Sequence, residues 1–327
     1  MGELPVALTM GDPAGVGPEI TIRALAKQGG IDYPVRVFGD RRRLAEASAA
    51  VQKAGWSVDL DLDSLDLVDL ANVPARAPWG VLSAASGRAG YDYLEAATRA
   101  ALGGSVSAVC TAPINKEAWR LAGIPHTGHT EALAALCGVD SFAMMLANQR
   151  LRVVHLSTHS SLVEAVALAT TERCLDCVKL AAGFLRDRAG IPEPRIAVAG
   201  INPHAGENGL LGTEDRDQLR PAVERARELG VNATGPWSPD IVFARGAAGE
   251  FDCVIAAYHD QGHIPIKLLG LDTGVNITIG LPLIRTSVDH GTAFDIAGTG
   301  EARPLNLVTA LRLARDLAGN ITDEASN

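Results

Sequence analysis

Three histidines lie in short polar segments that each follow an apolar, strand-like run of the sequence. They are His159, His204 and His259. Imidazole is the commonest neutral ligand of divalent metals, and a metal site that still binds substrate typically uses about three protein ligands. Asp240 and Asp260 add carboxylates that could orient the rings or accept a proton during catalysis. The sequence therefore predicts a catalytic metal site, assembled by the fold because these residues are far apart in the chain.

A glycine-rich turn joins the first expected strand to the first expected helix. Residues 9–19 read TMGDPAGVGPE and include Gly11, Asp12 and Gly15. Such a turn lets backbone amides approach a ligand and directs a helix N-terminus at anionic groups. Its spacing matches neither the dinucleotide-binding G-x-G-x-x-G motif nor the Walker A motif. A binding loop and a tight structural turn both remain open from the spacing alone.

Other polar residues lie at expected helix starts. His129 follows Gly128 and could donate a hydrogen bond to a phosphate or carboxylate, with a structural role as the alternative. Lys116 is interpreted as a solvated side chain on a capped helix. His155, inside an apolar run, is expected to be a core residue. His263 is not expected to align with His259 on a helix, because a glycine and a proline lie close by.

The elements that must position these residues alternate between short apolar runs and longer stretches of helical period, which predicts a layered α/β protein. Strands are expected at residues 5–9, 35–38, 108–111, 142–147, 151–156, 195–199 and 253–257. Helices are expected at residues 19–28, 40–54, 85–102, 116–122, 129–137, 160–168, 171–188, 213–227 and 304–318. Residues 57–78 are ambiguous and could form edge strands.

Length and composition restrict the class of protein. A chain of 327 residues with 47% hydrophobic residues is long enough for two domains with substantial cores. The net charge of -9, with scattered Lys and Arg, disfavours nucleic acid or an anionic membrane as the partner. No apolar run is long enough to span a bilayer and no signal peptide is evident, so a cytoplasmic protein is expected. Five dispersed cysteines are expected to be reduced core thiols.

A longer motif towards the C-terminal end carries a family resemblance. Residues 285–300, RTSVDHGTAFDIAGTG, resemble the loop that contacts the adenosine half of the dinucleotide in isocitrate and isopropylmalate dehydrogenases. Five further motifs occur in order along the chain, at residues 11–19, 111–116, 128–131, 202–207 and 259–262. Together they resemble the 4-hydroxythreonine-4-phosphate dehydrogenase family, PdxA, over nearly the whole chain.

The resemblance implies an α/β fold of the isocitrate/isopropylmalate dehydrogenase type, with two α/β/α layered domains flanking a cleft. The expected domains are residues 1–130 with 286–327, which carry the cofactor loops, and residues 131–285, which carry the metal ligands and the dimer interface. The resemblance also implies a homodimer with a shared active site. By the same resemblance, the metal would be held by His159, His204 and His259, two of them from one subunit and the third from the partner.

Substrate contacts implied by the resemblance fall on His129, Thr130, Lys267, Asn276 and Arg285, whose cations suit a phosphate and a carboxylate. The implied cofactor is NAD or NADP. Its contacts would be Gly11, Asp12, Gly15, Asp289, His290, Gly291, Thr292, Ala293 and Asp295. The metal would be one divalent ion, with Zn, Mg, Co and Mn as candidates; three imidazoles favour zinc or another transition ion.

The activity implied is oxidation of the 3-hydroxyl of a phosphorylated hydroxy acid, followed by decarboxylation. The first expectation is conversion of 4-phosphooxy-L-threonine to 3-amino-2-oxopropyl phosphate in pyridoxal phosphate biosynthesis. Residues 262–265, GHIP, depart from the biosynthetic pattern. They resemble relatives that oxidise 4-phospho-D-threonate or 4-phospho-D-erythronate, which is the alternative.

Three other interpretations remain. A cis-dihydrodiol dehydrogenase shares the GHIP segment, but residues 128–131, GHTE, favour a phosphorylated substrate. A metal-dependent hydrolase would also use three histidines and carboxylates. A non-catalytic binding protein is disfavoured because the ligands and the cofactor motif are all present.

Overall fold

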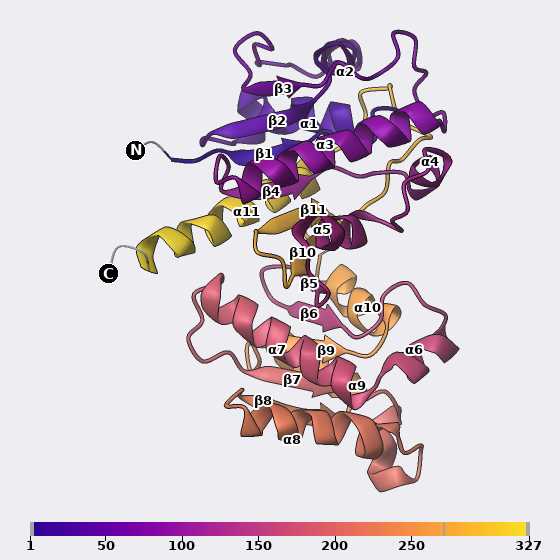
Figure 1. Cartoon of the computed structure of the whole chain (residues 1–327), viewed down its shortest axis with the longest axis vertical. Helices are drawn as coiled ribbons and strands as arrows, with labels where there is room; N and C mark the ends of the chain where they lie inside the picture. The colour runs from indigo at the N-terminus through magenta and orange to yellow at the C-terminus, as the bar shows by residue number, and fades with distance from the viewer. Residues whose placement is uncertain (1–2, 271, 325–327) are drawn as a thin grey trace. The chain divides into compact units, whose positions relative to one another are not determined.

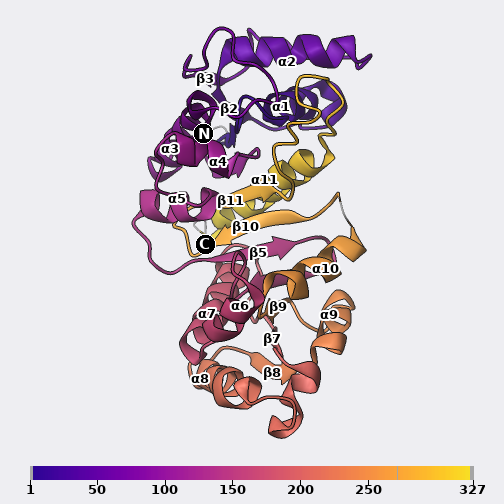
Figure 2. The ribbon, with the colours of Figure 1, turned by 90° about the vertical axis from the view of Figure 1, so that its right-hand side faces the viewer.

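The structure is a computed structural model that describes residues 3–270 and 272–324. The chain divides into two compact units (Figures 1 and 2). The first unit comprises the described residues of Met1–Asp140 together with Leu281–Ala318. The second comprises Ser141–Gly280 and the described residues that follow Ala318. Each unit has its own strands and helices.

The strands of the first unit are parallel to their neighbours in the order β3-β2-β1-β4-β11. They are β1 (Val6–Thr9), β2 (Val35–Gly39), β3 (Leu67–Asp69), β4 (Ala108–Thr111) and β11 (Arg285–Val288). The helices are α1 (Gly17–Leu25), α2 (Arg41–Lys53), α3 (Ala84–Leu102), α4 (Lys116–Leu121), α5 (His129–Cys137) and α11 (Leu305–Glu324), with a 3-10 turn η1 (Lys27–Gly29). Parallel pairing brings the turns that follow β1, β4 and β11 to one edge.

The strands of the second unit follow the order β10-β5-β6-β9-β7-β8. Strand β5 is antiparallel to both neighbours, whereas the remaining pairs are parallel. The strands are β5 (Ala143–Ala147), β6 (Arg152–His155), β7 (Ile196–Ala199), β8 (Ala233–Trp237), β9 (Cys253–Ala256) and β10 (Val275–Ile279). The helical segments are α6 (Leu162–Leu168), α7 (Thr171–Asp187), η2 (Pro203–Gly209), η3 (Asp215–Leu219), α8 (Arg220–Glu228), α9 (Pro239–Ala247) and α10 (His259–Leu269).

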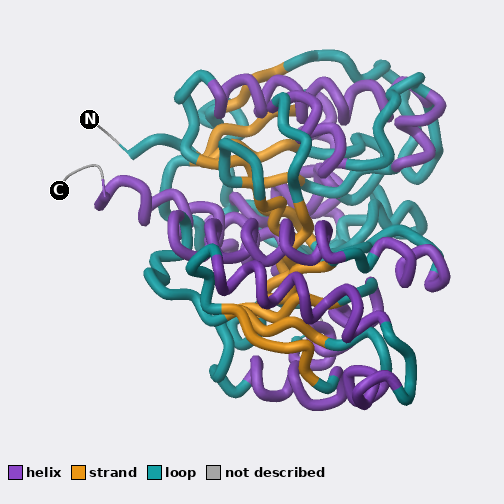
Figure 3. The backbone as a smooth tube through the Cα atoms, turned by 60° about the horizontal axis from the view of Figure 1, so that its bottom comes forward, coloured by secondary structure: helices purple, strands orange, loops and turns teal. Residues whose placement is uncertain are grey.

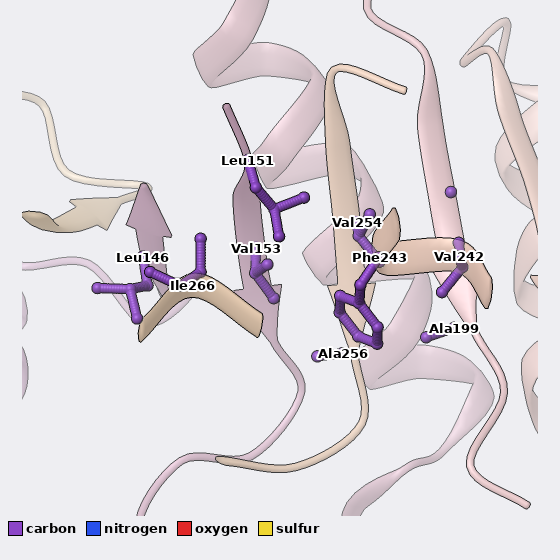
Figure 4. Packing of buried hydrophobic residues seen from close by; sticks show 10 residues of the cluster. Leu146, Leu151, Val153, Ala199, Val242, Phe243, Val254, Ala256 and Ile266 are labelled. Atoms are coloured by element: carbon purple, nitrogen blue, oxygen red, sulfur yellow. The ribbon is translucent and has the colours of Figure 1, made fainter. Parts of the chain in front are cut away.

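Helices α9 and α10 hold the second unit's polar loops through an apolar core. Phe243 of α9 and Ile266 of α10 pack in one cluster with Val153 and Val254 of the sheet (Figure 4). Figure 3 shows these strands bordered by helices. Burying a side chain of this size contributes about 1.5–3 kcal/mol. The N-terminal end of α10, which begins with His259, is therefore fixed by packing further along the same helix.

The α/β class is confirmed, and all seven expected strands are present within a few residues. Strands β8, β10 and β11 and helices α9 and α10 were not expected. Four of the five cysteines are buried and all five are free thiols, as expected. None of the helices in the described residues has the length and hydropathy that a membrane span needs.

One expectation was wrong. His259 and His263 do align on a helix, because α10 continues through Pro265. The two rings stack with centroids 3.7 Å apart and planes 12° from parallel. Pro265 lies inside α10, where its missing N–H removes the bond to the carbonyl of residue 261, and the helix nevertheless continues to Leu269. Gly262 is needed there, since a Cβ would lie 2.3 Å from Nε2 of His155.

His155 is buried at 1% exposure, as expected of a core residue. Burial, reinforced by the nearby rings of His263 and His259, lowers the pKa of His155 to about 3. Its ring is therefore neutral in the folded chain at pH values where the unfolded chain binds a proton. The lowered pKa does not change the free energy of unfolding well above pH 6.5. As the pH falls below 6.5, the unfolded chain binds a proton that the folded chain does not bind, and the folded state is destabilised.

We expect His155→Gln to reduce the loss of unfolding free energy that occurs as the pH falls. Between pH 7 and pH 5 the wild-type chain should lose about 2 kcal/mol more unfolding free energy than the variant. Urea denaturation at a series of pH values measures the difference. His290→Gln, at an exposed position, is the control and should retain the wild-type slope. Equal slopes for wild type and His155→Gln would contradict the assignment.

Candidate functional site

The glycine-rich turn of the first unit is held against the segment that follows β4. The amide of Asp12 donates to the carbonyl of Pro113 at 2.9 Å. A Cβ on Gly11 would lie 2.3 Å from that same oxygen, and Gly11 has φ of 74°. The Asp12 carboxylate accepts a 2.8 Å bond from the amide of Ala14, and burial raises the pKa of Asp12 to about 6. The turn is thus a rigid, close-packed loop.

The predicted cofactor loop packs directly on this turn. The amide of Val16 donates to the carbonyl of Thr292 at 2.9 Å, and a Cβ on Gly15 would lie 2.8 Å from the Cβ of Thr292. The buried Glu19 accepts a hydrogen bond from the amide of Gly300. Two segments far apart in sequence therefore form one surface, which carries Gly15 and Thr292 together.

The remaining predicted cofactor residues lie along the same loop. The amide of Asp289 donates to Oδ1 of Asn306 at 2.8 Å. Nδ1 of His290 lies 2.9 Å from the carbonyl oxygen of Gly291. Ala293 has φ of 43°, and Asp295 is exposed. The loop is thus held at its first residue by α11, while Asp295 and His290 remain accessible to a ligand.

Arg43 supports this surface and was missed in the sequence. Its Nε donates to the carbonyl of Pro13 at 2.6 Å, and its guanidinium lies 3.6 Å from the centre of the Trp79 ring. Only 1% of Arg43 is exposed. Trp79 in turn occupies the space that a Cβ on Gly298 would need. One arginine in a run of three gives no sequence signal that distinguishes it from its solvated neighbours.

Three cationic or potentially cationic side chains converge at the start of α5. Arg285 is 3% exposed and donates from Nη2 to Oγ1 of Thr111 at 2.7 Å. Desolvation, with the charges of Arg285 and Lys116, lowers the pKa of His129 well below its ordinary value. Nε2 of His129 is buried and has no hydrogen-bond partner among the described residues. Thr130 is the next residue of the same helix and is half-buried.

This cluster suits an anion. A neutral imidazole with an unsatisfied buried nitrogen, held between two positive charges, is costly unless a ligand completes it. A phosphate would accept hydrogen bonds from these groups and relieve the repulsion between them. Lys116 is exposed on a helix capped by Asn115, as expected, and its charge also acts on His129.

In the second unit, His204 lies in an unusual turn. Residues 204–208 all have positive φ, from 47° to 77°. The carboxylate of Asp215 holds the preceding segment by accepting from the amides of Ile201 at 2.7 Å and Asn202 at 3.1 Å. Left-handed backbone in non-glycine residues costs about 1 kcal/mol or more per residue and persists where the surroundings enforce it. The turn presents His204 as an exposed side chain.

His204 is linked to Asp240 through the hydroxyl of Ser238. Its Nδ1 lies 3.5 Å from Oγ of Ser238, which also donates to Asp240. That hydroxyl lowers the pKa of Asp240. Asp240 and Asp260 line the same cavity, of about 400 Å³, together with Tyr258. Both predicted catalytic carboxylates therefore face one space.

His259 begins α10 and is oriented by its neighbour. Its Nδ1 lies 2.7 Å from Oδ1 of Asp260, which leaves Nε2 as the ring nitrogen directed away from that carboxylate. This carboxylate–histidine pairing is the usual arrangement behind a metal-bound imidazole. His263 stacks on His259 and bonds through Nδ1 to the carbonyl of His259 at 3.0 Å. Burial, and then the His259 ring, lower the pKa of His263 to about 4.

Gln261 connects the two histidine turns. Its Oε1 accepts from the amide of Ala257 at 2.7 Å, and its Nε2 donates to the carbonyl of Gly200 at 2.8 Å. One side chain thus spans the turn after β9, which precedes His259, and the turn after β7, which precedes His204. Gln261 is 9% exposed, so both bonds are sheltered from water.

The single chain does not complete the predicted metal site. Among the described residues, no three histidine, cysteine or carboxylate side chains lie close enough together to hold a metal ion. His159 is exposed in the loop after β6 and acts electrostatically on His155. Of the predicted substrate residues in this unit, Lys267 lies on α10 and Asn276 on β10. Imidazole nitrogens suit a metal in type, and Nε2 of His259 is directed away from Asp260.

Comparisons with known proteins place the chain among characterised families. A family model described as "Pyridoxal phosphate biosynthetic protein PdxA" matches residues 31–314. The chain is 44% identical to D-threonate 4-phosphate dehydrogenase of Salmonella typhimurium, over 96% of this chain and 98% of the relative. It is 45% identical to 4-hydroxythreonine-4-phosphate dehydrogenase of Beijerinckia indica, over 96% of this chain and 95% of the relative.

A solved structure agrees with these relatives. The crystal structure of 4-hydroxythreonine-4-phosphate dehydrogenase from Klebsiella pneumoniae is similar to this chain, with a TM-score of 0.88 and 44% identity. The match covers 97% of this chain and 98% of that chain.

We expect Gln261→Ala to lower the unfolding free energy by about 2 kcal/mol, because it leaves a buried amide and a buried carbonyl without partners. Denaturant titration measures the loss. Gln149→Ala, at an exposed position in the same unit, is the matched control and should change stability by less than about 0.5 kcal/mol. If Gln261→Ala were as stable as Gln149→Ala, Gln261 would not join the two turns.

Proposed function

Because the chain belongs to the family of the pyridoxal phosphate biosynthetic protein PdxA and is a dehydrogenase, we propose that it uses NAD or NADP to oxidise the 3-hydroxyl of a phosphorylated four-carbon acid. The reaction would continue with loss of carbon dioxide from the resulting β-keto acid. This proposal rests on the cluster of Lys116, His129 and Arg285. Within it, the buried Nε2 of His129 has no hydrogen-bond partner among the described residues.

The cluster's proposed role is to bind the anionic groups of the substrate. Arg285, already fixed by Thr111, presents a rigid guanidinium that suits a bidentate anion. His129 would donate from its buried nitrogen, and Thr130 would add a hydroxyl. Lys267 and Asn276 are proposed as further substrate contacts.

The cofactor is proposed to lie on the surface made by the turn at residues 11–17 and the loop at residues 289–300. The amides of Asp12, Ala14, Gly15 and Val16 bond within the protein, so the proposed role of the turn is to position the loop that contacts the dinucleotide. Thr292 and the accessible Asp295 and His290 would contact the remainder of the dinucleotide. The choice between NAD and NADP is left to the assay below.

His159, His204 and His259 are proposed to hold one divalent metal ion. When bound, such an ion lowers the pKa of a coordinated alcohol and stabilises negative charge on a neighbouring oxygen. Asp260 orients His259, so its proposed role is to position that ring. Asp240 lies across the same cavity and is proposed as the proton acceptor.

The substrate is proposed to be 4-phosphooxy-L-threonine or 4-phospho-D-threonate. Relatives named for either substrate are about equally similar to this chain. The two compounds differ at C2, which carries an ammonium group in the first and a hydroxyl in the second. The GHIP segment favours the hydroxy acid. His263 in that segment, with its pKa near 4, would be a neutral hydrogen-bonding partner at pH 7.

We further propose a homodimer in which the partner completes the metal site. Large exposed apolar side chains follow each proposed ligand within about ten residues of sequence: Val163 is 83% exposed after His159, Leu210 is 77% exposed after His204, and Leu268 is 82% exposed after His259. Exposed apolar residues that recur around one set of polar side chains favour a protein interface. A second copy of the chain would bury them and supply the missing ligand.

The reaction is tested by the appearance of NADH or NADPH at 340 nm on mixing the protein with metal, dinucleotide and each substrate. We expect turnover, with kcat/KM at least tenfold higher for 4-phospho-D-threonate than for 4-phosphooxy-L-threonine, about the effect of one substrate hydrogen bond. Arg285→Ala should lower kcat/KM by a factor of about 100 or more through loss of a buried charged contact. Arg99→Ala is the control on an exposed helix face. Absence of reduced dinucleotide with both substrates would contradict the proposal.

The shared metal site is tested by pairing inactive variants. His159→Ala, His204→Ala and His259→Ala should each lose bound metal, measured by elemental analysis, and each lose activity. If two ligands come from one chain and the third from its partner, two of the three pairwise mixtures should recover about a quarter of wild-type activity after subunit exchange. No recovery in any mixture would contradict a site shared between chains.

A further inference from the structure

The first unit contains a second cavity that has no part in the proposed reaction. It has a volume of about 870 Å³ and lies where the end of α1, the residues after α2 and the start of α11 meet. Its lining includes Arg23, Trp56, Arg303 and Arg312. None of the predicted metal, substrate or cofactor residues lines it. A volume of this size is in the range that binds cofactor-sized molecules.

The three arginines give the cavity a positive lining. Arg23 donates from Nη1 to the carbonyl of Ala302 at 2.6 Å, and Arg312 donates from Nη2 to the carbonyl of Gly30 at 3.2 Å. Each guanidinium has five N–H donors, so these bonds fix the groups in place and leave most donors available. Glu301 is the one carboxylate among the described residues that line this cavity. The charged lining of the cavity is therefore net positive, in a chain whose net charge is -9.

Like charges also line the cavity together. Burial lowers the pKa of Arg23, the charge of Glu19 opposes this shift, and the charge of Arg303 adds to it. Arg303 is exposed. An anion placed between these guanidinium groups would remove their repulsion and accept several charge-assisted hydrogen bonds.

Trp56 gives the cavity a flat aromatic wall. The guanidinium of Arg23 lies 3.9 Å from the centre of its ring, and the residue is 50% exposed. A large aromatic side chain exposed to this extent, with one face held by a cation, offers its remaining surface to a second planar group. Stacking of a base on such a side chain contributes about 1–3 kcal/mol.

We propose that this cavity binds a nucleotide-sized ligand, with its phosphate groups on Arg23, Arg303 and Arg312 and its ring on Trp56. Residues 301–305, which line it, follow directly on the proposed cofactor loop. The site is nevertheless separate from that surface, because neither the turn at residues 11–17 nor Thr292 contributes to the lining.

The test uses ADP as the probe and the full-length protein. The protein is first saturated with NAD, so that the dinucleotide site is filled, and ADP is then titrated while tryptophan fluorescence is recorded. We expect saturable quenching that disappears in Trp56→Phe and persists in Trp79→Phe, whose ring lies at the cofactor loop. Quenching that persists in Trp56→Phe, or that NAD abolishes, would overturn the proposal.

Affinity measured by calorimetry tests the charge part. The double variant Arg303→Ala/Arg312→Ala should bind ADP at least tenfold more weakly, whereas Arg99→Ala should bind as the wild type does. Inorganic phosphate and adenosine should each bind at least tenfold more weakly than ADP, because each satisfies half of the site. Phosphate that binds as tightly as ADP would overturn the role of Trp56, and an unchanged double variant would overturn the role of the arginines.

Discussion

In each unit, the candidate residues depend on loops that hydrogen-bond to one another at the ends of the strands. In the first unit, the amide of Asp12 reaches the carbonyl of Pro113 and the amide of Val16 reaches that of Thr292. In the second, Gln261 bonds to both Ala257 and Gly200. A buried backbone group without a partner costs about 1–3 kcal/mol, so these bonds hold each loop in one arrangement. The loops keep their places even where few of their residues belong to a strand or helix.

Much of this was predictable from the sequence, and the exceptions have physical causes. Strands such as Val6–Thr9 are short apolar runs buried on both faces, and periodicity finds them readily. Hydrophobic periodicity does not predict strand β11, Arg285–Val288, because its buried residues are mainly polar and its arginine binds Thr111. Helix α10 was not predicted because proline and glycine usually end helices. Here Gly262 lies within the helix, where the absence of a Cβ leaves space for His155. The identities of the candidate residues came from motifs, while their supporting contacts, such as Arg43 and Gln261, came only from the structure.

The charges around His129 differ in sign from the net charge of the whole chain. The chain carries a net charge of -9, which disfavours anionic partners for the molecule as a whole. Yet Arg285 is buried, and the pKa of His129 is lowered by desolvation together with the charges of Arg285 and Lys116. A small anion responds to the few charges within a Debye length of its site, about 10 Å at ordinary ionic strength, and hardly to the total. An acidic protein can therefore bind a phosphorylated substrate.

The proposed metal ligands differ from a core histidine in their exposure. A histidine that served only to stabilise the fold would be buried, as His155 is at 1% exposure and with its lowered pKa. His204 instead is exposed on a left-handed turn whose backbone strain is compensated by Asp215. Exposed apolar side chains follow it in the sequence, and they too lack an interior to pack against. A second chain would satisfy both needs at once, since the contact that covers the apolar groups would also bring a further ligand. The motif identifies the ligand types, but which subunit supplies each one is a property of the assembly.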